Sequence, residues 1–296
     1  MKIIVTGSLG HISRPLVQKL TAAKHEVTVI SSNVDRKSEI EALGAKAAIG
    51  SVSDLAFVTN TFKGADAVYT MVPPTFSASD WKQHIAGIGK IYAQAIAAAG
   101  VKNVVNLSSM GAHMPENCGP VSGLYYVEQA LNALEGVNVK HLRPGFFYYN
   151  FFANFGMIKH MGIMGGNYGE SAKLVLSNPA DIADAAAEEL LNLNFKGKSV
   201  RYLVSDEKTT DEVASILGAA IGKPDLKWVN FSDADTLGGM LQNGLPADIA
   251  KNYTEMGAAM RSGEMASDYL KNKPAKFGRT IFEAFALVFA AAYKQQ

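Results

Sequence analysis

The first twenty residues combine a short apolar strand, a glycine turn and a helical pattern. Lys2–Val5 is almost wholly apolar, and Leu16, Val17 and Leu20 recur at helical spacing. Between them, Thr6–Ser13 reads TGSLGHIS. A strand that runs through a glycine turn into a helix predicts a βα unit of the kind that opens dinucleotide-binding domains.

The alternation of strands and helices continues to residue 107. Beyond the first unit we expect strands over Glu26–Ile30, Ala45–Ile49, Ala67–Met71 and Val101–Leu107. We expect helices over Lys37–Leu43, Ser53–Phe62 and Trp81–Ala99, the second with Ser53 as its N-cap and the third ended by Gly100. This alternation predicts an α/β fold, a doubly wound parallel (Rossmann) sheet with helices on both faces. Ligands of such sheets bind at the carboxyl ends of the strands, where the strand order reverses.

The pattern changes after Gly145. Phe146–Phe155 holds seven aromatic residues in ten, and residues 156–169 read as a loop rich in glycine and methionine. The elements expected further on are a helix from Pro179, a strand over Val200–Val204, a capping box at Thr209 and Glu212, a strand over Trp228–Phe231, and helices up to Tyr293. We therefore expect residues 1–150 to form the dinucleotide-binding domain, with 175–206 returning to it. Residues 151–174 and 207–296 would form a smaller, mainly helical lobe.

Composition limits the classes of function. The chain has 296 residues, is 48% hydrophobic and carries a formal charge of +1, which gives no electrostatic reason to bind nucleic acid or an anionic membrane. The single cysteine, Cys118, excludes an internal disulfide and fits a reducing compartment. The start of the chain enters a core strand at once, which leaves no room for a signal peptide. The apolar run Ile281–Tyr293 is too short to span a bilayer and contains Glu283. We expect a cytoplasmic protein with no membrane contact.

The glycine turn is the main candidate for a ligand site. Gly7 suits the tight turn after the strand, Gly10 lets a pyrophosphate approach the backbone, and the helix N-terminus offers free N–H groups. Ser13 stands where the usual third glycine would be. The expected cofactor contacts in the turn are Gly7, Ser8, Leu9, Gly10, His11 and Ile12. The alternative is an ordinary tight turn with no ligand.

The end of the second predicted strand favours NADP(H) over NAD(H). NAD-binding folds place a carboxylate there, which accepts hydrogen bonds from the adenosine ribose hydroxyls. This chain has Ser31-Ser32-Asn33 followed by Arg36, with Asp35 deeper in the loop. Hydroxyl groups and an arginine would bind a 2′-phosphate that a carboxylate would repel. We therefore expect Ser31, Asn33 and Arg36 to contact the cofactor. The alternative is that Arg36 and Lys37 form a solvated helix start.

These features resemble the NmrA-like family, an atypical branch of the short-chain dehydrogenase/reductase superfamily. The resemblance covers nearly the whole chain and rests on Thr6–Ser13, Ala67–Pro74, Gly100–Ser109, Val127–Leu131, Leu142–Asn150 and Pro179–Ala183. It implies a nicotinamide-binding fold whose members include reductases of quinones and other small molecules, as well as nucleotide-sensing regulators. It also adds Val72, Pro73, Ser108 and Pro144 to the expected cofactor contacts.

The chain departs from the superfamily at the catalytic dyad. Short-chain dehydrogenases usually carry Tyr-x-x-x-Lys, with the tyrosine as acid and the lysine lowering its pKa. With Glu128 placed in the family register, Val121 and Tyr125 occupy the dyad positions. Tyr269 and Lys273 match the string, but they lie in the C-terminal lobe and read as a chance match. The catalytic group is thus unidentified.

Other polar residues near the expected site are candidates for catalysis. We retain Ser108, Tyr125 and Tyr126 as the candidates, and Ser109 lies beside them. Each of the four could equally be a packed residue whose hydroxyl is hydrogen-bonded within the protein. The six histidines have no metal-ligand spacing, and no hydrolase or kinase motif is present.

A reductase without a positioned acid suits a quinone, because the hydroquinone anion is stable enough to take a proton from water. Phe146, Phe147 and Tyr149, with Phe152 beside them, would form a slot for a planar acceptor, or else simply join the two lobes. We therefore predict an NADPH-dependent reductase of quinones or similar small planar electrophiles. The alternatives are a non-catalytic NADP(H)-sensing regulator and, third, a sugar-nucleotide epimerase or dehydratase, which the missing dyad disfavours. The oligomeric state cannot be predicted from these patterns.

Overall fold

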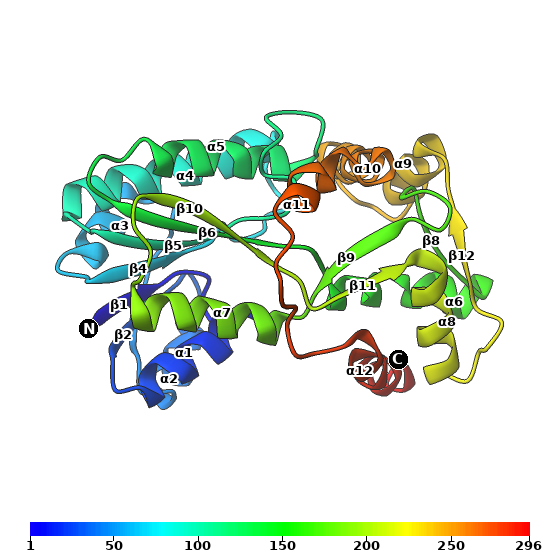
Figure 1. Cartoon of the computed structure of the whole chain (residues 1–296), viewed down its shortest axis with the longest axis horizontal. Helices are drawn as coiled ribbons and strands as arrows, with labels where there is room; N and C mark the ends of the chain where they lie inside the picture. Colours follow the sequence, from blue (N-terminus) through cyan, green and yellow to red (C-terminus); the bar gives the residue numbers. More distant parts are fainter.

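The computed structural model describes residues 1–296 and is built around a seven-stranded sheet (Figure 1). All neighbouring strands are parallel, in the order β10-β6-β5-β4-β1-β2-β3. The strands are β1 (Lys2–Val5), β2 (Glu26–Ser31), β3 (Lys46–Ile49), β4 (Ala67–Thr70), β5 (Asn103–Leu107), β6 (Asn138–Pro144) and β10 (Lys198–Leu203). The strand order reverses between β1 and β4, so the carboxyl ends of these two strands border the crevice where such folds bind ligands.

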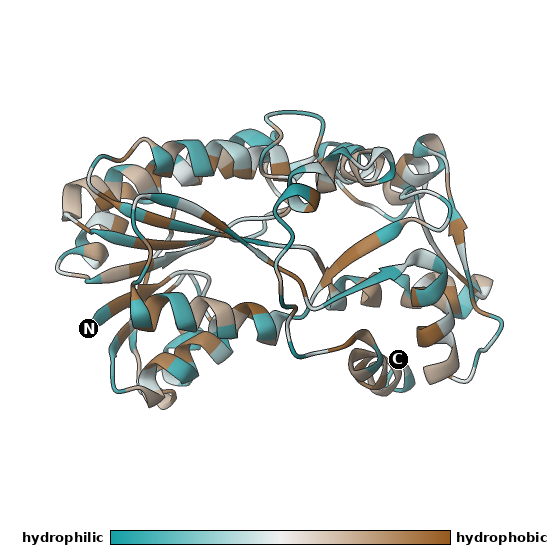
Figure 2. Ribbon diagram, in the orientation of Figure 1, coloured by the Kyte–Doolittle hydropathy of each residue, from teal (hydrophilic) through white to brown (hydrophobic).

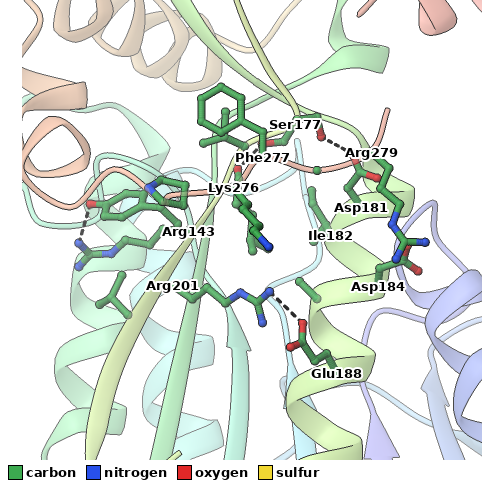
Figure 3. A pocket seen from close by; sticks show the side chains of 18 of the residues that line it. Arg143, Ser177, Asp181, Ile182, Asp184, Glu188, Arg201, Lys276, Phe277 and Arg279 are labelled. Carbon is green, nitrogen blue, oxygen red and sulfur yellow. Dashed lines mark hydrogen bonds and ion pairs between the residues drawn. The ribbon is translucent and has the colours of Figure 1, made fainter. Parts of the chain in front are cut away.

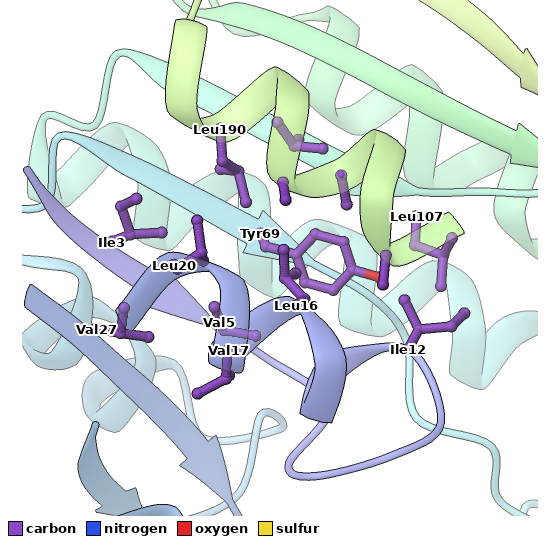
Figure 4. Close-up of a cluster of buried hydrophobic side chains, with 14 of the residues drawn as sticks. Ile3, Val5, Ile12, Leu16, Val17, Leu20, Val27, Tyr69, Leu107 and Leu190 are labelled. Atoms are coloured by element: carbon purple, nitrogen blue, oxygen red, sulfur yellow. The ribbon is translucent and has the colours of Figure 1, made fainter. Parts of the chain in front are cut away.

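Helices cover both faces of this sheet because successive strand residues point to opposite sides. Ile3 and Val5 lie in one buried cluster, with α1 and α7, whereas Ile4 lies in another, with α3, α4 and α5. Figure 4 shows the first cluster, in which Leu16 and Leu20 of α1 face the sheet. The helices are α1 (Ser13–Ala22), α2 (Lys37–Ala42), α3 (Leu55–Phe62), α4 (Trp81–Ala99), α5 (Pro120–Asn132) and α7 (Pro179–Asn192). The predicted doubly wound fold is confirmed.

The helix ends show how local chemistry sets the boundaries. Gly100 ends α4 in a left-handed conformation, with φ +70°, as predicted. The N-cap of α3 is Asp54 rather than Ser53, because the Asp54 carboxylate accepts a hydrogen bond from the Phe57 N–H at 3.0 Å. The backbone N–H of Ser53 instead donates to the Ser51 hydroxyl. The prediction of Ser53 was therefore wrong by one residue.

The C-terminal lobe has its own core and two small sheets. β9 (Lys173–Ser177) pairs with β11 (Asp206–Thr209) and with β7 (Phe146–Phe147), and β8 (Ile163–Gly166) pairs with β12 (Lys227–Asn230). The helices are α6 (Phe155–Met161), α8 (Thr210–Ala220), α9 (Asp233–Gln242), α10 (Ala247–Ser262), α11 (Ser267–Lys271) and α12 (Phe282–Lys294), with short 3₁₀ segments η1 (Val34–Arg36), η2 (Tyr148–Asn154) and η3 (Glu264–Ala266). The capping box at Thr209 and Glu212 is present. None of the helices is both long and apolar enough to cross a bilayer.

Two segments of this lobe differ from the sequence-based expectation. Residues 156–169 are not one loop: they contain most of α6 and all of β8, and Ile158 and Met164 are fully buried in the lobe core. β8 pairs with β12, more than sixty residues further along the chain, and no local pattern reveals such a partner. Within the segment 175–206, β10 joins the seven-stranded sheet and α7 packs against its face. Residues 175–177 lie instead in β9, and Asp206 in β11, of the three-stranded sheet.

A buried polar chain crosses the middle of the large sheet at His141 of β6. The imidazole contacts Asn132 Oδ1 through Nε2 at 2.9 Å and Asn106 Nδ2 through Nδ1 at 3.1 Å. Asn106 Oδ1 in turn accepts a hydrogen bond from the Thr70 hydroxyl at 2.9 Å. A neutral imidazole fits these partners, since Nδ1 then accepts while Nε2 donates. Burial lowers the pKa of His141 to about 4.

This histidine predicts a loss of stability in acid. Below the pKa of an exposed histidine, about 6.5, the unfolded chain binds a proton that the folded chain does not take up until about pH 4. The free energy of unfolding should therefore fall by about 2 kcal/mol between pH 7 and pH 5, as urea denaturation would show. His141→Gln keeps one donor and one acceptor but does not titrate. In this variant the free energy of unfolding should therefore depend less steeply on pH. If the free energy of unfolding of this variant changed with pH as steeply as that of the parent, other groups would cause the pH dependence.

Candidate functional site

The glycine turn follows β1 and requires a glycine at its first position. Gly7 and Ser8 are left-handed, with φ +88° and +54°. A Cβ at Gly7 would lie 2.8 Å from Met71 Cγ and 2.9 Å from Ser13 Oγ. The Ser13 hydroxyl donates to the Thr6 carbonyl at 3.2 Å, so the serine in the usual place of a third glycine ties the start of α1 to the turn. The protein's own packing therefore demands Gly7 and accommodates Ser13.

Gly10 is different, because nothing in the protein occupies the space beside it. It is exposed, has no positive φ, and an added Cβ would meet only the Gly7 carbonyl, at 3.5 Å. No side chain caps the N-terminus of α1, which begins three residues later. The side chains of Leu9 and Ile12 are buried in the first core, so only their backbone is available to a ligand. The turn therefore combines an open backbone approach with an uncapped helix N-terminus, the features that bind phosphate groups.

The end of β2 is hydrogen-bonded to the glycine turn. The Ser8 hydroxyl donates to Ser31 Oγ at 2.9 Å, and the Ser8 N–H donates to the Ile30 carbonyl at 3.0 Å. Ser31 is buried and also accepts from the Asn33 N–H. The Asn33 side chain accepts from the Asp35 N–H at the start of η1. Ser31 and Asn33 therefore shape the loop that follows β2.

Two arginines share one carboxylate beside this loop. Arg36 Nη1 contacts both carboxylate oxygens of Glu39, at 3.0 and 2.9 Å, and Arg14 Nη2 contacts Glu39 as well. The three side chains are 40–43% exposed. Hydrogen bonding from Arg14 is the main cause that lowers the pKa of the Glu39 carboxyl. Two guanidinium groups against one carboxylate leave a net positive charge. Sequence reasoning missed Arg14, whose only signal is its place one helical turn after Gly10.

The aromatic segment divides into two groups with different neighbours. Tyr148 and Phe151 are fully buried in the C-terminal lobe, where their rings lie 5.2 and 5.5 Å from Phe282. Tyr149 instead lies 4.8 Å from the His11 imidazole and 5.3 Å from the Phe147 ring, measured between centroids. The segment therefore joins the lobes through one set of rings and brings another set to the glycine turn.

A cavity of about 140 Å³ lies where the two lobes meet. Phe146 and Phe147 line it, as does Ser109, whereas Tyr149 does not. Its other lining residues are Met110, Gly145, Asn150, Lys173, Leu174, Val175, Met256, Met260, Met265 and Ala266. Most of the wall is apolar, and three of its four methionines come from α10 and η3, more than a hundred residues after the aromatic segment. Sequence reasoning did not identify them.

Ser108 belongs to a buried ionic network. Its hydroxyl donates to Glu128 Oε1 at 2.5 Å, and Arg143 contacts both carboxylate oxygens of Glu128, at 2.9 and 2.6 Å. Arg143 Nη1 also reaches the Tyr202 hydroxyl and the Asp268 carboxylate, at 3.1 and 3.0 Å. The Ser108 hydroxyl therefore already donates its proton in a hydrogen bond to the Glu128 carboxylate. The network links the residue after β5, helix α5 and strands β6 and β10 to α11 of the second lobe.

The tyrosines considered for catalysis lie outside the cavity wall. Tyr125 and Tyr126 are neighbours on α5 with rings at 89° and 5.1 Å apart, and Tyr126 is 48% exposed. Tyr269 and Lys273, the Tyr-x-x-x-Lys match, both contact the Glu207 carboxylate, at 2.6 and 2.8 Å. Burial raises the pKa of Tyr269. The two side chains are therefore part of an ion cluster around Glu207, and their match to the Tyr-x-x-x-Lys string is consistent with chance.

The remaining expected contacts lie at strand ends. Val72 and Pro73 follow β4 and are half-buried. Pro144 ends β6, and its carbonyl accepts from the Met110 N–H at 2.8 Å. Pro144 therefore positions the chain that leads into the cavity.

A larger groove of about 1430 Å³ runs between α7, β10 and residues 272–279 (Figure 3). Its charges are partly paired: Arg201 contacts Glu188 at 2.9 Å, and Lys19 contacts Asp184 at 2.7 Å. No residue of the glycine turn lines it. The groove is therefore separate from the candidate site.

The doubly wound sheet, with a glycine turn leading to an uncapped helix at the switch point, defines a dinucleotide-binding fold. The profile of the NmrA-like family matches residues 1–263. The chain belongs to the NmrA-like family, as its motifs predicted.

Three known proteins show what this chain is similar to. An NAD(P)H azoreductase from Xenophilus azovorans is 26% identical over 295 residues, which cover 98% of this chain and 99% of the relative. An NADPH-dependent quinone oxidoreductase from Escherichia coli, solved with NADPH, shares the fold with a TM-score of 0.79, 22% identity and 99% coverage of both chains. A triphenylmethane reductase from Citrobacter sp., solved with NADP(H), gives a TM-score of 0.78 and 22% identity, covering 98% of this chain and 100% of that one.

Proposed function

We propose that this protein is an NADPH-dependent reductase of quinones or similar small planar electrophiles. The observation that carries the proposal is the placement of the open glycine turn against the aromatic row of His11, Tyr149 and Phe147. A dinucleotide bound along the turn would bring its nicotinamide end towards aromatic surfaces and the cavity that Phe147 lines. The azoreductase, the quinone oxidoreductase and the triphenylmethane reductase support the same class of reaction. We expect the protein to act in the cytoplasm, since its single thiol is free and buried.

The residues present fit the dinucleotide by the chemistry of its parts. The backbone of the glycine turn and the α1 N-terminus would hold the pyrophosphate, and Arg14 and Arg36 would hold a 2′-phosphate. Bound NADPH would supply the hydride. This chain's own contribution is to orient a flat acceptor on Phe147, which lines the cavity, and on Tyr149, which lies beside Phe147 and His11. The methionine-lined wall would exclude water.

The preference for NADPH is testable at Arg36. Arg36→Ala should weaken NADPH binding by about 1.5–3 kcal/mol, the value of a charge-assisted hydrogen bond, and leave NADH binding nearly unchanged. Isothermal titration calorimetry with both cofactors measures the difference. Glu39→Gln is the matched control, since it releases both arginines from their shared carboxylate and should not weaken NADPH binding. An equal loss for both cofactors in Arg36→Ala would make Arg36 structural.

Steady-state turnover tests the mechanism. General acid catalysis typically contributes about 10²–10⁴-fold, so loss of the acid would be obvious. We expect Tyr125→Phe and Tyr126→Phe to keep quinone reduction within about tenfold of the parent, because the two tyrosines neither line the cavity nor stack on His11, Tyr149 or Phe147. Phe147→Ala and Tyr149→Ala should instead raise the KM for the acceptor by loosening its stacking surface. If either Tyr→Phe variant reduced quinones a hundredfold or more slowly than the parent, that tyrosine would be identified as a proton donor.

The size of the cavity favours a second candidate function. At about 140 Å³ it is smaller than most ligand sites, which measure about 300–1,000 Å³. A protein that binds NADP(H) and reports its redox state to a partner would need no acceptor pocket. NADPH binding without oxidation across a broad panel of quinones, azo dyes and triphenylmethane dyes would favour this sensor over the reductase.

A further inference from the structure

Helix α12 is apolar on both of its sides. Its inner side places Phe282, Phe285 and Phe289 in the core of the C-terminal lobe. Its outer side is exposed and consists of Ile281, just before the helix, and then Ala284, Leu287, Val288 and Ala291. Leu287 is 72% exposed and Val288 58%. A helix on the surface of a monomer normally presents a polar outer side, so this one lacks a partner. Figure 2 shows hydrophobic colouring on this helix, which lies at the edge of the lobe.

The outer residues form one stripe with a symmetric order. Ala284, Leu287, Val288 and Ala291 are spaced as i, i+3, i+4 and i+7, so they lie on one face of the helix. The two large side chains stand in the middle and the two small ones at the ends. Glu283 lies in the first turn and Lys294 in the last. The stripe is therefore self-complementary when the helix is reversed.

We propose that this stripe, Ala284–Ala291, packs against the same stripe of a second copy of the chain. The two α12 helices would run antiparallel about a two-fold axis between Leu287 and Val288, which gives an isologous contact. Leu287 would then face the partner's Val288, and Ala284 the partner's Ala291, where small side chains let the helices approach closely. Lys294 would come near the partner's Glu283, and the helix dipoles would oppose each other favourably.

Charge and area identify the occupant and the strength of the contact. Helices that bind membrane surfaces carry many lysines and arginines on their polar side, whereas α12 holds a single basic residue. A second copy supplies both the apolar stripe and a carboxylate for Lys294: Glu283 contacts Lys208 of its own chain at 3.0 Å, but its side chain is 47% exposed and can accept a second cation. The stripe alone offers on the order of a few hundred Å² of apolar surface, below the roughly 800 Å² per subunit of a standard interface. The dimer should therefore be reversible and visible only in a concentration series.

Sedimentation equilibrium of the full chain tests the proposal, with helix content and melting temperature as checks of folding. The parent should dimerise with increasing concentration, and Leu287→Glu and Leu287→Lys should each weaken dimerisation by at least about 100-fold, because each brings like charges together at the two-fold axis. An equimolar mixture of the two variants should recover the dimer. Leu270→Glu, which changes a residue that is 66% exposed on α11, is the matched control and should dimerise like the parent.

Oxidative cross-linking tests the antiparallel register. Cys118 is the only cysteine and is buried, and burial raises the pKa of its thiol to about 12, so introduced surface cysteines would react alone. Ala284→Cys chains mixed with Ala291→Cys chains should form a disulfide-linked dimer, and neither should do so by itself, because like positions lie about 10 Å apart along the helix. A parent that stays monomeric at all concentrations, binding to neutral or anionic vesicles by a monomer, or Leu287 variants that dimerise like the parent would each overturn the proposal.

Discussion

Replacing Gly10 with valine should abolish NADPH binding while the chain still folds cooperatively. Gly10 is exposed, has no positive φ, and its nearest neighbour for an added Cβ is a carbonyl oxygen at ordinary contact distance. Valine therefore fits the protein itself. Its branched side chain would instead fill the space through which a pyrophosphate must approach the uncapped N-terminus of α1. Calorimetry should detect no binding at NADPH concentrations about 100 times the parent's Kd, a loss of more than about 2.7 kcal/mol.

The matched control for this experiment is the other glycine of the turn. Gly7→Val places a side chain at φ +88° and against Met71 and Ser13, so it should lower the melting temperature itself. The two variants separate a glycine needed by a ligand from a glycine needed by the fold. If Gly10→Val retained NADPH binding, the cofactor site would lie elsewhere and the proposed function would lose its main support.

Most of the large sheet could be predicted because its signals are local. The strand ending at Val5, the helix Trp81–Ala99 and its stop at Gly100 all follow from periodicity and turn chemistry within a few residues. The capping box at Thr209 is equally local. The single error at a helix start, Ser53 for Asp54, concerned two adjacent residues that both suit an N-cap.

The parts that could not be predicted depend on partners distant in the chain. β8 exists because β12 pairs with it, and its glycines and methionine carry no strand signal of their own. Arg14 becomes relevant only because Glu39 brings it beside Arg36. The candidate site behaves in the same way. Its backbone half can be predicted from the glycine turn, whereas the cavity wall is assembled from separate segments between Ser109 and Ala266.

Ser108 shows that residue type does not reveal the partners of a side chain. A hydroxyl at the end of a central strand is a natural candidate for catalysis, yet here it donates to a carboxylate that also binds a buried arginine. The same network explains why a conspicuous glutamate, Glu128, lies on the buried side of α5. Its charge is balanced by Arg143, whose side chain is only 8% exposed.

Removing the Glu128 carboxylate, which balances the charge of Arg143, should lower the free energy of unfolding more than any other substitution considered. Glu128→Ala would leave the Arg143 guanidinium buried, with Asp268, whose side chain is 33% exposed, as its remaining carboxylate partner at 3.0 Å. Breaking a buried ion pair on one side typically costs about 3–5 kcal/mol, so we expect a loss of that size in the free energy of unfolding from urea denaturation. Lys46→Ala is the control, because Lys46 and its partner Glu26 are 70% and 50% exposed and exposed ion pairs contribute no more than about 1 kcal/mol.

A compensating double variant separates the buried charge from the loss of packing. Glu128→Leu combined with Arg143→Met removes both charges at similar volume and should recover most of the stability lost in Glu128→Ala, since a well-packed apolar pair often replaces a buried ion pair without cost. A double variant no more stable than Glu128→Ala would mean that the hydrogen bonds to Ser108, Tyr202 and Asp268, rather than the unpaired charge, hold the two lobes together at this point. A loss below about 1 kcal/mol in Glu128→Ala itself would show that water or Asp268 satisfies Arg143 without the glutamate.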